Sequence, residues 1–254
     1  FSSELYLKAL LQVQPEDIRR VAEKYITATA WAQAILAPTG KKTAAASVAT
    51  AAAVPVKKTI NGVPVIIRSD ARLPLVTVTV SFKAGLLWEN EGNNGITSFA
   101  ADLMTRGSAD YSKDELDAAF ESRGASFGSF AGNNSMGLSF TSLSGDADKL
   151  FPLFKDCLLN PAFPEAECAK RRAVQIAGIQ SRTEDPGTVA WDNLRKAIFG
   201  KHPYAFDASG TTNAVAQFTS DKLRAYVSGL LVRSNVTVSV FGNLSSAKAE
   251  AFAA

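Results

Sequence analysis

The sequence predicts an α+β fold in which a largely antiparallel sheet is covered by helices on one face. Strand-like segments arrive as adjacent pairs, helical segments are gathered between the pairs, and strict alternation of strand and helix is absent. The chain has 254 residues, of which 46% are apolar. This is enough for one large domain or two ordinary ones with a sizeable core.

Composition excludes several classes of protein. Lys and Arg outnumber Asp and Glu by only 27 to 24 and are scattered, so no nucleic-acid partner is expected. No apolar run reaches the roughly 18 residues of a spanning helix, so we expect no membrane span. The chain opens on Phe1 without a signal-peptide pattern, and we therefore expect a fragment of a longer protein. Cys157 and Cys168 are predicted to be buried free thiols.

The first segment is predicted to be separate from the rest. A helix is expected from Pro15, where a first-turn proline and two acids precede apolar residues at helical spacing, and a short strand is expected at 31–36. Residues 39–57 are almost wholly Ala, Thr, Ser, Val and Lys, which predicts an interdomain linker, with an Ala-rich helix as the alternative. Residues 1–38 are then the tail of a preceding domain.

The elements of the main domain, residues 58–254, follow from local patterns. β-rich runs predict strands at 63–68, 75–82, 125–131, 136–143 and 235–242. Apolar residues at helical spacing predict helices at 92–104, 112–124, 146–159, 164–182, 187–199 and 219–229. The short connection at 69–74 suggests that the first two strands form a hairpin, and Gly and Asn residues at 132–135 indicate a turn between the next two.

Few residues offer catalytic chemistry. The single histidine, His202, lies after a predicted helix and beside a proline, so we expect its ring to pack on its own loop rather than act as a base. Acidic clusters lie where helices begin and are interpreted as partners of the helix dipole. They are Glu184-Asp185 and the group Asp114, Glu115 and Asp117. No serine-hydrolase elbow, Walker loop or dinucleotide fingerprint occurs.

Residues 95–108 resemble a known metal-binding helix. They read Gly-Ile-Thr-Ser-Phe-Ala-Ala-Asp-Leu-Met-Thr-Arg-Gly-Ser, which is similar to the inverted zinc motif Gly-x-x-His-x-x-Glu-His-x-x-x-x-Gly-Thr of the pitrilysin/insulinase family of zinc metallopeptidases. Further segments resemble the family's strands and its Phe-Gly-x-His-Pro segment: they are 61–65, 82–85, 199–204 and 236–242. The similarity therefore extends over most of the chain.

The resemblance places the family's zinc positions at poor ligands. In active members two histidines four residues apart hold zinc, and the glutamate between them polarises water. Ser98 and Asp102 stand at the histidine positions, Ala101 at the glutamate, and Gly178 at the third ligand, a glutamate on a later helix. The resemblance thus implies a domain with no catalytic residue, no metal and no cofactor of its own. Another metal held by Ser98 and Asp102 is the open alternative.

By this resemblance the chain is a fragment of a zinc metallopeptidase homologue. Residues 1–38 would end its first half, and residues 58–254 would be the third of four domains. This non-catalytic half would help to enclose and bind a peptide or protein substrate, which a zinc-bearing N-terminal half outside this chain would cleave. The alternative is a scaffolding or assembly subunit of the same fold without peptidase activity. The family's long members suggest a periplasmic or otherwise exported protein, with a cytoplasmic one as the alternative.

Overall fold

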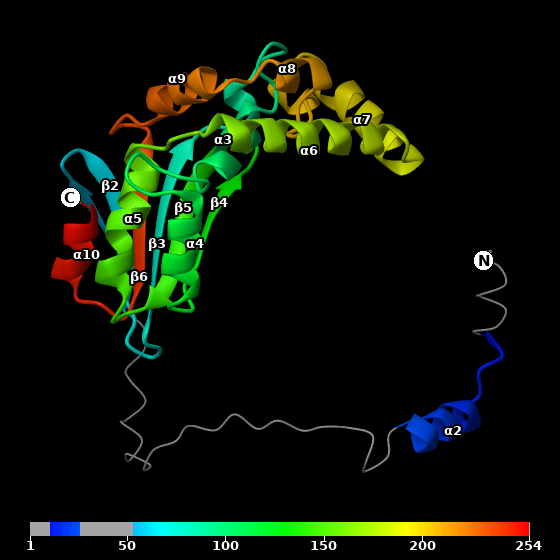
Figure 1. Ribbon diagram of the computed structural model, residues 1–254, viewed down its shortest axis with the longest axis horizontal. Coiled ribbons are helices and arrows are strands. Elements are labelled where there is room, and N and C mark those ends of the chain that lie inside the picture. The colour runs from blue at the N-terminus through cyan, green and yellow to red at the C-terminus, as the bar shows by residue number, and fades with distance from the viewer. Residues whose placement is uncertain (1–10, 26–52, 254) are drawn as a thin grey trace. The chain divides into compact units, whose positions relative to one another are not determined.

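Figure 1 shows the computed structural model, which describes residues 11–25 and 53–253. These two parts are described separately. In the first, helix α2 (Pro15–Tyr25) begins at the predicted proline, and its first turn carries Asp17, which accepts a hydrogen bond from Arg20 Nη2 at 3.0 Å. The predicted strand at 31–36 and most of the predicted linker at 39–57 lie outside the described residues.

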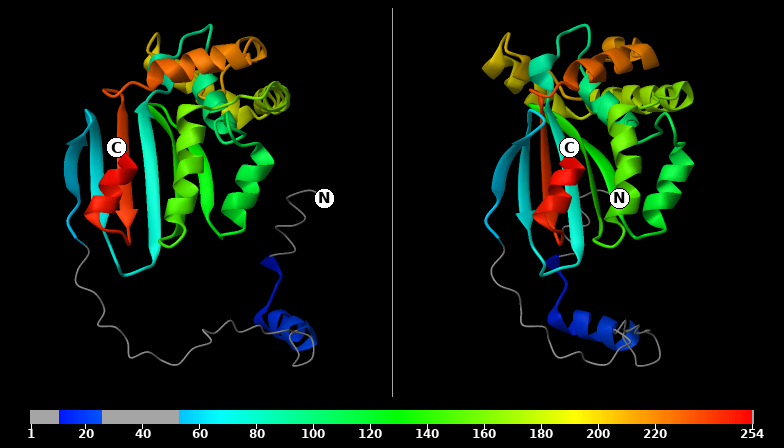
Figure 2. Two further views of the ribbon diagram at one scale, coloured as in Figure 1. Left: turned by 60° about the vertical axis from the view of Figure 1, so that its left-hand side comes forward. Right: turned by 90° about the vertical axis from the view of Figure 1, so that its left-hand side faces the viewer.

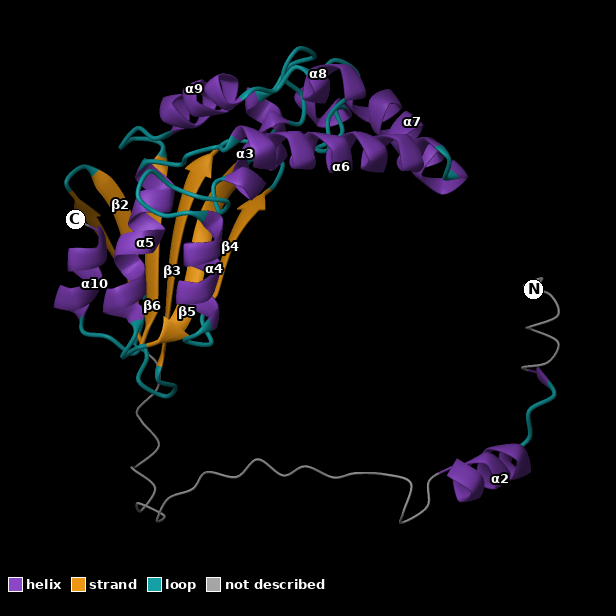
Figure 3. Ribbon diagram, in the orientation of Figure 1, coloured by secondary structure: helices purple, strands orange, loops and turns teal. Residues whose placement is uncertain are grey.

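The second part is built on a six-stranded sheet (Figure 3). Its strands are β1 (Val56–Ile60), β2 (Val63–Ser69), β3 (Leu75–Lys83), β4 (Ser126–Ala131), β5 (Ser135–Leu143) and β6 (Val236–Gly242). Their order across the sheet is β1-β2-β6-β3-β5-β4. Within residues 53–253, β2 and β6 run parallel and all other neighbouring pairs run antiparallel. The predicted α+β class with a largely antiparallel sheet is confirmed.

Two predictions about the strands are wrong. The strands at 63–68 and 75–82 do not form a hairpin, because β6 lies between them: Val238 stands opposite Val65 on one side and Val80 on the other. Strand β6 comes from far along the chain and is as apolar as its neighbours, so a local sequence pattern cannot predict its position in the sheet. The predicted linker also ends too late, since β1 begins at Val56 and pairs with β2 across an Asn61-Gly62 turn in which both φ angles are positive.

Helices cover one face of the sheet and one of its ends. Their bounds are α3 (Ile96–Leu103), α4 (Lys113–Glu121), α5 (Ala147–Leu159), α6 (Glu165–Thr183), α7 (Pro186–Phe199), α8 (Thr212–Ala216), α9 (Ser220–Leu230) and α10 (Ser246–Ala253), with short 3-10 turns at Leu86–Trp88 and Pro203–Ala205. Helices α4, α5 and α10 lie against one face (Figure 2), and α3 and α6 to α9 gather across one end (Figure 1). The short α8 and the C-terminal α10 were not predicted.

The core lies between the sheet and the helices on its covered face. In β3 the buried residues are Val76, Val78, Val80 and Phe82, and they alternate with half-buried hydroxyl residues, as a strand with one covered face requires. On the opposite face the hydroxyl side chains bond across strands: the pair Thr77 and Thr141 and the pair Thr79 and Ser139 each lie 2.9 Å apart. In the described part of the chain, no helix is both long enough and apolar enough to span a bilayer.

Candidate functional site

Helix α3 carries the sequence that resembles the zinc motif, and its first turn is anchored by a buried carboxylate. Glu89 is only 6% exposed, and its carboxylate accepts hydrogen bonds from Gly95 N at 2.8 Å, Thr97 N at 3.0 Å and Asn94 Nδ2 at 2.9 Å. A negative charge is stabilised at the positive end of a helix. Gly95 has a φ of 92°, which favours glycine, and the helix therefore begins at Ile96 and not at the predicted residue 92.

The inner face of α3 belongs to the core. Phe99, Leu103 and Met104 are buried, and Phe99 packs edge to face on Phe218 with ring centroids 5.3 Å apart. Ala101, at the position predicted for the family's catalytic glutamate, is also buried. These apolar contacts hold the helix in place.

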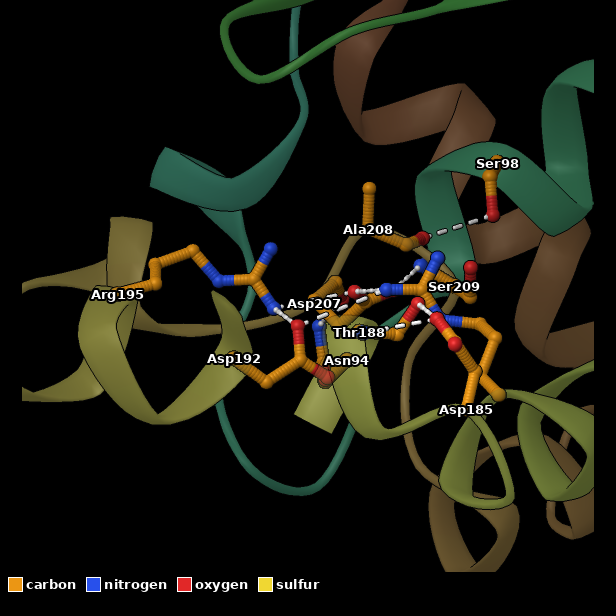
Figure 4. Close-up of polar contacts among 10 residues, drawn as sticks. Asn94, Ser98, Asp185, Thr188, Asp192, Arg195, Asp207, Ala208 and Ser209 are labelled. Carbon is orange, nitrogen blue, oxygen red and sulfur yellow. Dashed lines mark hydrogen bonds and ion pairs between the residues drawn. The ribbon is translucent and has the colours of Figure 1, made fainter. Parts of the chain in front are cut away.

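The outer face of α3 looks toward α6. The Ser98 hydroxyl can donate to either Gly95 O, at 3.1 Å, or Ala208 O, at 3.0 Å, and the second contact is drawn in Figure 4. The Asp102 carboxylate lies 3.4 Å from Arg171 Nε and 3.6 Å from Arg106 Nη2. Both polar side chains are therefore already engaged with protein groups.

Two adjoining hollows between α3 and α6 bring the predicted positions together, and we call them the α3–α6 depression. Ser98 and Gly178 line the first, of about 480 Å³, and Asp102 lines the second, of about 310 Å³. The two hollows share Arg171 and Val174. The positions predicted for the family's metal ligands are thus neighbours in space, whereas the buried Ala101 lines neither hollow.

The depression is walled by the loop at residues 207–209, which sequence reasoning missed. Asp207 accepts hydrogen bonds from Arg182 Nη2 at 2.6 Å, Arg195 Nη2 at 3.1 Å and Ser209 N at 2.7 Å, and its carbonyl oxygen accepts one from Asn94 Nδ2 at 2.9 Å (Figure 4). These contacts tie the loop to α6, α7 and the start of α3. An Asp two residues before a Ser in a turn was the local signal available.

Electrostatics favour the ionised form of Asp207. Burial alone would raise the pKa of this carboxyl, but the hydrogen bonds from Ser209 and Arg195 and the charge of Arg182 outweigh burial and lower the pKa below its usual value. Gln175 on α6 adds a second tie, because its Nε2 donates to Ser209 O at 2.7 Å. The wall of the depression is therefore fixed by charge-assisted and buried hydrogen bonds.

The side chains at these positions do not fit a zinc ion. Zinc sites in proteins use three or four ligands drawn from His, Cys, Asp and Glu. Here Asp102 offers one carboxylate already paired with two arginines, Ser98 offers a hydroxyl bonded to backbone carbonyls, and Gly178 offers no side chain. Across residues 11–25 and 53–253, no three His, Cys, Asp or Glu side chains come together.

The other residues considered from the sequence have structural roles. His202 lies in the predicted loop, where its Nδ1 accepts from Tyr204 N at 3.2 Å and its ring lies 4.7 Å from that of Tyr204. Asp185 caps α7, and Glu115 forms a capping box with Ser112 at the start of α4. The predictions of loop packing and helix-start acids are confirmed for these residues.

Both cysteines are buried and free, as predicted. Burial is the main cause that raises the pKa of the Cys157 thiol, to about 12, and burial also raises the pKa of Cys168. Burial therefore disfavours the nucleophilic thiolate form of both cysteines.

Comparison with protein families identifies the chain. Residues 64–212 match the Insulinase family (Peptidase family M16). The match covers more than half of the chain. The chain belongs to this family. The resemblance inferred from the motif helix is confirmed.

Individual relatives show how much of such proteins the chain represents. It is 25% identical over 185 residues to a Bacillus subtilis protein named uncharacterized zinc protease YmxG, covering 73% of this chain and 45% of that protein. It is 26% identical over 155 residues to subunit 1 of the bovine mitochondrial cytochrome b-c1 complex, covering 61% of this chain and 32% of that protein.

A solved structure agrees with both the fold and the length. A crystal structure described as the peptidase M16 inactive domain from Pseudomonas fluorescens superposes with a TM-score of 0.75 and 25% identity, covering 79% of this chain and 49% of that one. The chain thus spans about half the length, or less, of the relatives it matches.

Proposed function

We propose that this domain is a non-catalytic half of a zinc metallopeptidase homologue. It helps to enclose and bind peptide substrates, which a zinc-bearing half of the same polypeptide, outside this chain, cleaves. One observation carries the proposal: Ser98, Asp102 and Gly178, which the resemblance assigns to the family's zinc ligands, lie together between α3 and α6, and Ala101 stands at the position that it assigns to the base. The similarity to a named zinc protease and to a structure described as an inactive domain supports it.

Two surfaces of the sheet are suited to peptide. The uncovered face carries half-buried hydroxyl side chains, among them Thr77, Thr79 and Ser139, which can bond to polar peptide groups. Strand β4 stands last in the strand order, with β5 as its one neighbour in the sheet of the described residues, so its outer edge is available to an extended peptide. Backbone pairing of this kind tolerates many substrate sequences.

The family also suggests where the protein acts and what its partner carries. We propose that zinc is bound by the N-terminal half and that the protein is periplasmic or otherwise exported, because the resemblance is to long family members with these properties. Cell fractionation with an antibody to this domain tests the location. Recovery of the protein with cytoplasmic markers alone would overturn the exported assignment.

Binding and hydrolysis are separated by one experiment. The purified chain is mixed with a fluorescein-labelled, unstructured peptide, with and without added zinc, and both anisotropy and cleavage are followed. We expect binding without cleavage, because the base and metal ligands are missing. Cleavage by this chain that a chelator abolishes would refute the non-catalytic role. In a polypeptide that also carries the zinc-bearing half, chelator-sensitive cleavage is expected.

A scaffolding role is the second candidate, and an exposed apolar ridge on α7 favours it. Trp191, Leu194 and Ile198 follow one another along one side of this helix and are each at least 47% exposed. The bovine relative is named as a subunit of a larger complex. A scaffold predicts stable association through α7: sedimentation of the natural full-length protein would show a defined assembly that Trp191→Ser with Ile198→Ser disrupts, and no peptide would bind.

A further inference from the structure

We infer that the α3–α6 depression binds an acidic, extended segment of peptide. This inference rests on the proposed peptide-binding role and assigns the site and the class of ligand. In active relatives this place is expected to hold a cation between acidic and imidazole ligands. In this chain it is lined by cations of the protein itself, so the charge that it would attract is the opposite one.

The lining of the depression is basic. The charged residues that line the two hollows are Arg106, Lys170, Arg171 and Arg182 against Asp102 and Glu167, and Asp207 in the wall is paired with Arg182. Lys170 is balanced by Glu167 at 2.7 Å. Arg106 and Arg171 share the single carboxylate of Asp102 at 3.6 and 3.4 Å, which is longer than the hydrogen-bonded contact of a strong ion pair. One guanidinium charge is therefore left without a carboxylate of its own at the centre of the depression.

Arg182 extends the basic lining to the other end. Its Nη2 lies 2.6 Å from Asp207 and 3.6 Å from Asp192, and its side chain remains 42% exposed. A guanidinium has five N–H donors, so the remaining ones are free to meet a ligand carboxylate. Arg171 and Arg182 lie eleven residues apart on one helix, close to three full turns, and both line the first hollow.

The dimensions suit a short extended segment. Eleven helical residues span about 16 Å at the rise of an α-helix, which is the length of about five residues of extended peptide. Val174 is 64% exposed between the two arginines and offers an apolar contact. A Cβ added at Gly178 would meet no atom outside its own helix backbone within 4 Å, so the first hollow has room for a side chain at this position.

Gly178 allows the charge of the depression to be changed without disturbing the fold. Gly178→Glu places a carboxylate among the arginines, and Gly178→Gln adds a side chain of the same size without the charge. Both variants have room for the added atoms and replace a glycine inside a helix, so both are expected to fold. Asp102→Asn makes the opposite change, because it releases Arg106 and Arg171 from their shared carboxylate.

The test is an anisotropy titration of the 254-residue chain and these variants. The probes are a fluorescein-labelled peptide in which Glu alternates with Ala and the same peptide with Gln at each Glu. We expect the Glu peptide to bind the natural chain more tightly than the Gln peptide, and Gly178→Glu to bind it about tenfold more weakly than Gly178→Gln. Asp102→Asn is expected to tighten its binding, and added salt to weaken it.

Each other outcome overturns the inference. If both peptides bind equally and Gly178→Glu changes neither, peptide binding stands but the acidic site does not. If the Glu peptide binds more tightly but none of the variants changes its affinity, acidic peptides bind elsewhere. If neither peptide binds, both the acidic site and the peptide-binding role proposed above are wrong.

Discussion

The two faces of helix α3 differ in how completely their polar groups are satisfied. On the side of the core, the carboxylate of Glu89 accepts three short hydrogen bonds and Phe99 is fully buried. On the side of α6, Asp102 is shared loosely between two arginines and its side chain is 38% exposed. The residues that anchor the helix and the positions that the resemblance assigns to the family's metal ligands therefore occupy different faces.

The largest loss of stability is expected from a change at Glu89, which anchors the first turn of α3. Glu89→Ala removes the acceptor of the backbone N–H groups of Gly95 and Thr97, both of which lie in the buried start of the helix. Unpaired buried donors are costly, so we expect a loss of about 3 kcal/mol in the free energy of unfolding, measured with urea. Glu91→Ala, at an exposed position in the same loop, is the matched control and should be neutral. Equal stability of the two variants would show that the anchor does not hold α3.

A change at Asp207, in the wall of the depression, is expected to cause an intermediate, pH-dependent loss of stability. Asp207→Asn removes charge-assisted hydrogen bonds to Arg182 and Arg195, and we expect a loss of about 2 kcal/mol at neutral pH. Because the folded-state pKa of Asp207 is lowered, its stabilisation is complete above the usual Asp pKa and is lost as the pH falls through the folded-state value.

The difference in the free energy of unfolding between the natural chain and Asp207→Asn should therefore shrink on acidification below about pH 4. Urea unfolding at a series of pH values measures it. A difference that stays constant from neutral to acidic pH would mean that the charge of Asp207 does not stabilise the loop.

A change at Gly178 is expected to have a smaller effect of the opposite sign, a gain in stability. This glycine lies inside α6, and a Cβ there would meet open space, so no packing reason retains it. Gly178→Ala should stabilise the domain by about 0.5–1 kcal/mol because alanine restricts the unfolded chain. Thermal unfolding measures the change. A destabilised variant would indicate that the depression is narrower than described.

The smallest effect on stability is expected at Asp102. Its ion pairs are long and partly exposed, and such pairs contribute little, so Asp102→Asn should change the free energy of unfolding by less than about 0.5 kcal/mol. Denaturant unfolding beside Glu89→Ala makes the comparison between the two faces direct. A loss as large as that of Glu89→Ala would place Asp102 among the residues that hold the fold.

Local patterns predicted the elements whose causes are local. Ser112 and Glu115 form the capping box that their spacing indicates, and the turn between β4 and β5 lies where Gly and Asn are concentrated. The Asn61-Gly62 turn carried an equally local signal for a hairpin, but the first two residues of the strand before it, Val56 and Lys57, were assigned to the linker, and no strand was predicted at 58–60. The insertion of β6 between β2 and β3 depends on a segment over 150 residues away, which no window reveals.

The candidate site likewise has some features that the sequence could predict and others that it could not. The resemblance to the family motif placed Ser98, Asp102 and Gly178 together, and the structure brings them to one depression. The contacts of Asp207 with Arg182 and Arg195 could not be predicted, because three charged residues at irregular spacing form a cluster only after α6 and α7 have packed. Charges that meet through tertiary contacts leave no periodic trace in a sequence.

The zinc content of the purified chain tests the central claim most directly. The chain is incubated with zinc, dialysed and measured by elemental analysis, beside a family domain with an intact His-x-x-Glu-His motif as the positive control. Because Ser98, Asp102 and Gly178 supply one engaged carboxylate among them, we predict zinc far below one ion per chain. Stoichiometric zinc that Asp102→Asn abolishes would contradict the account.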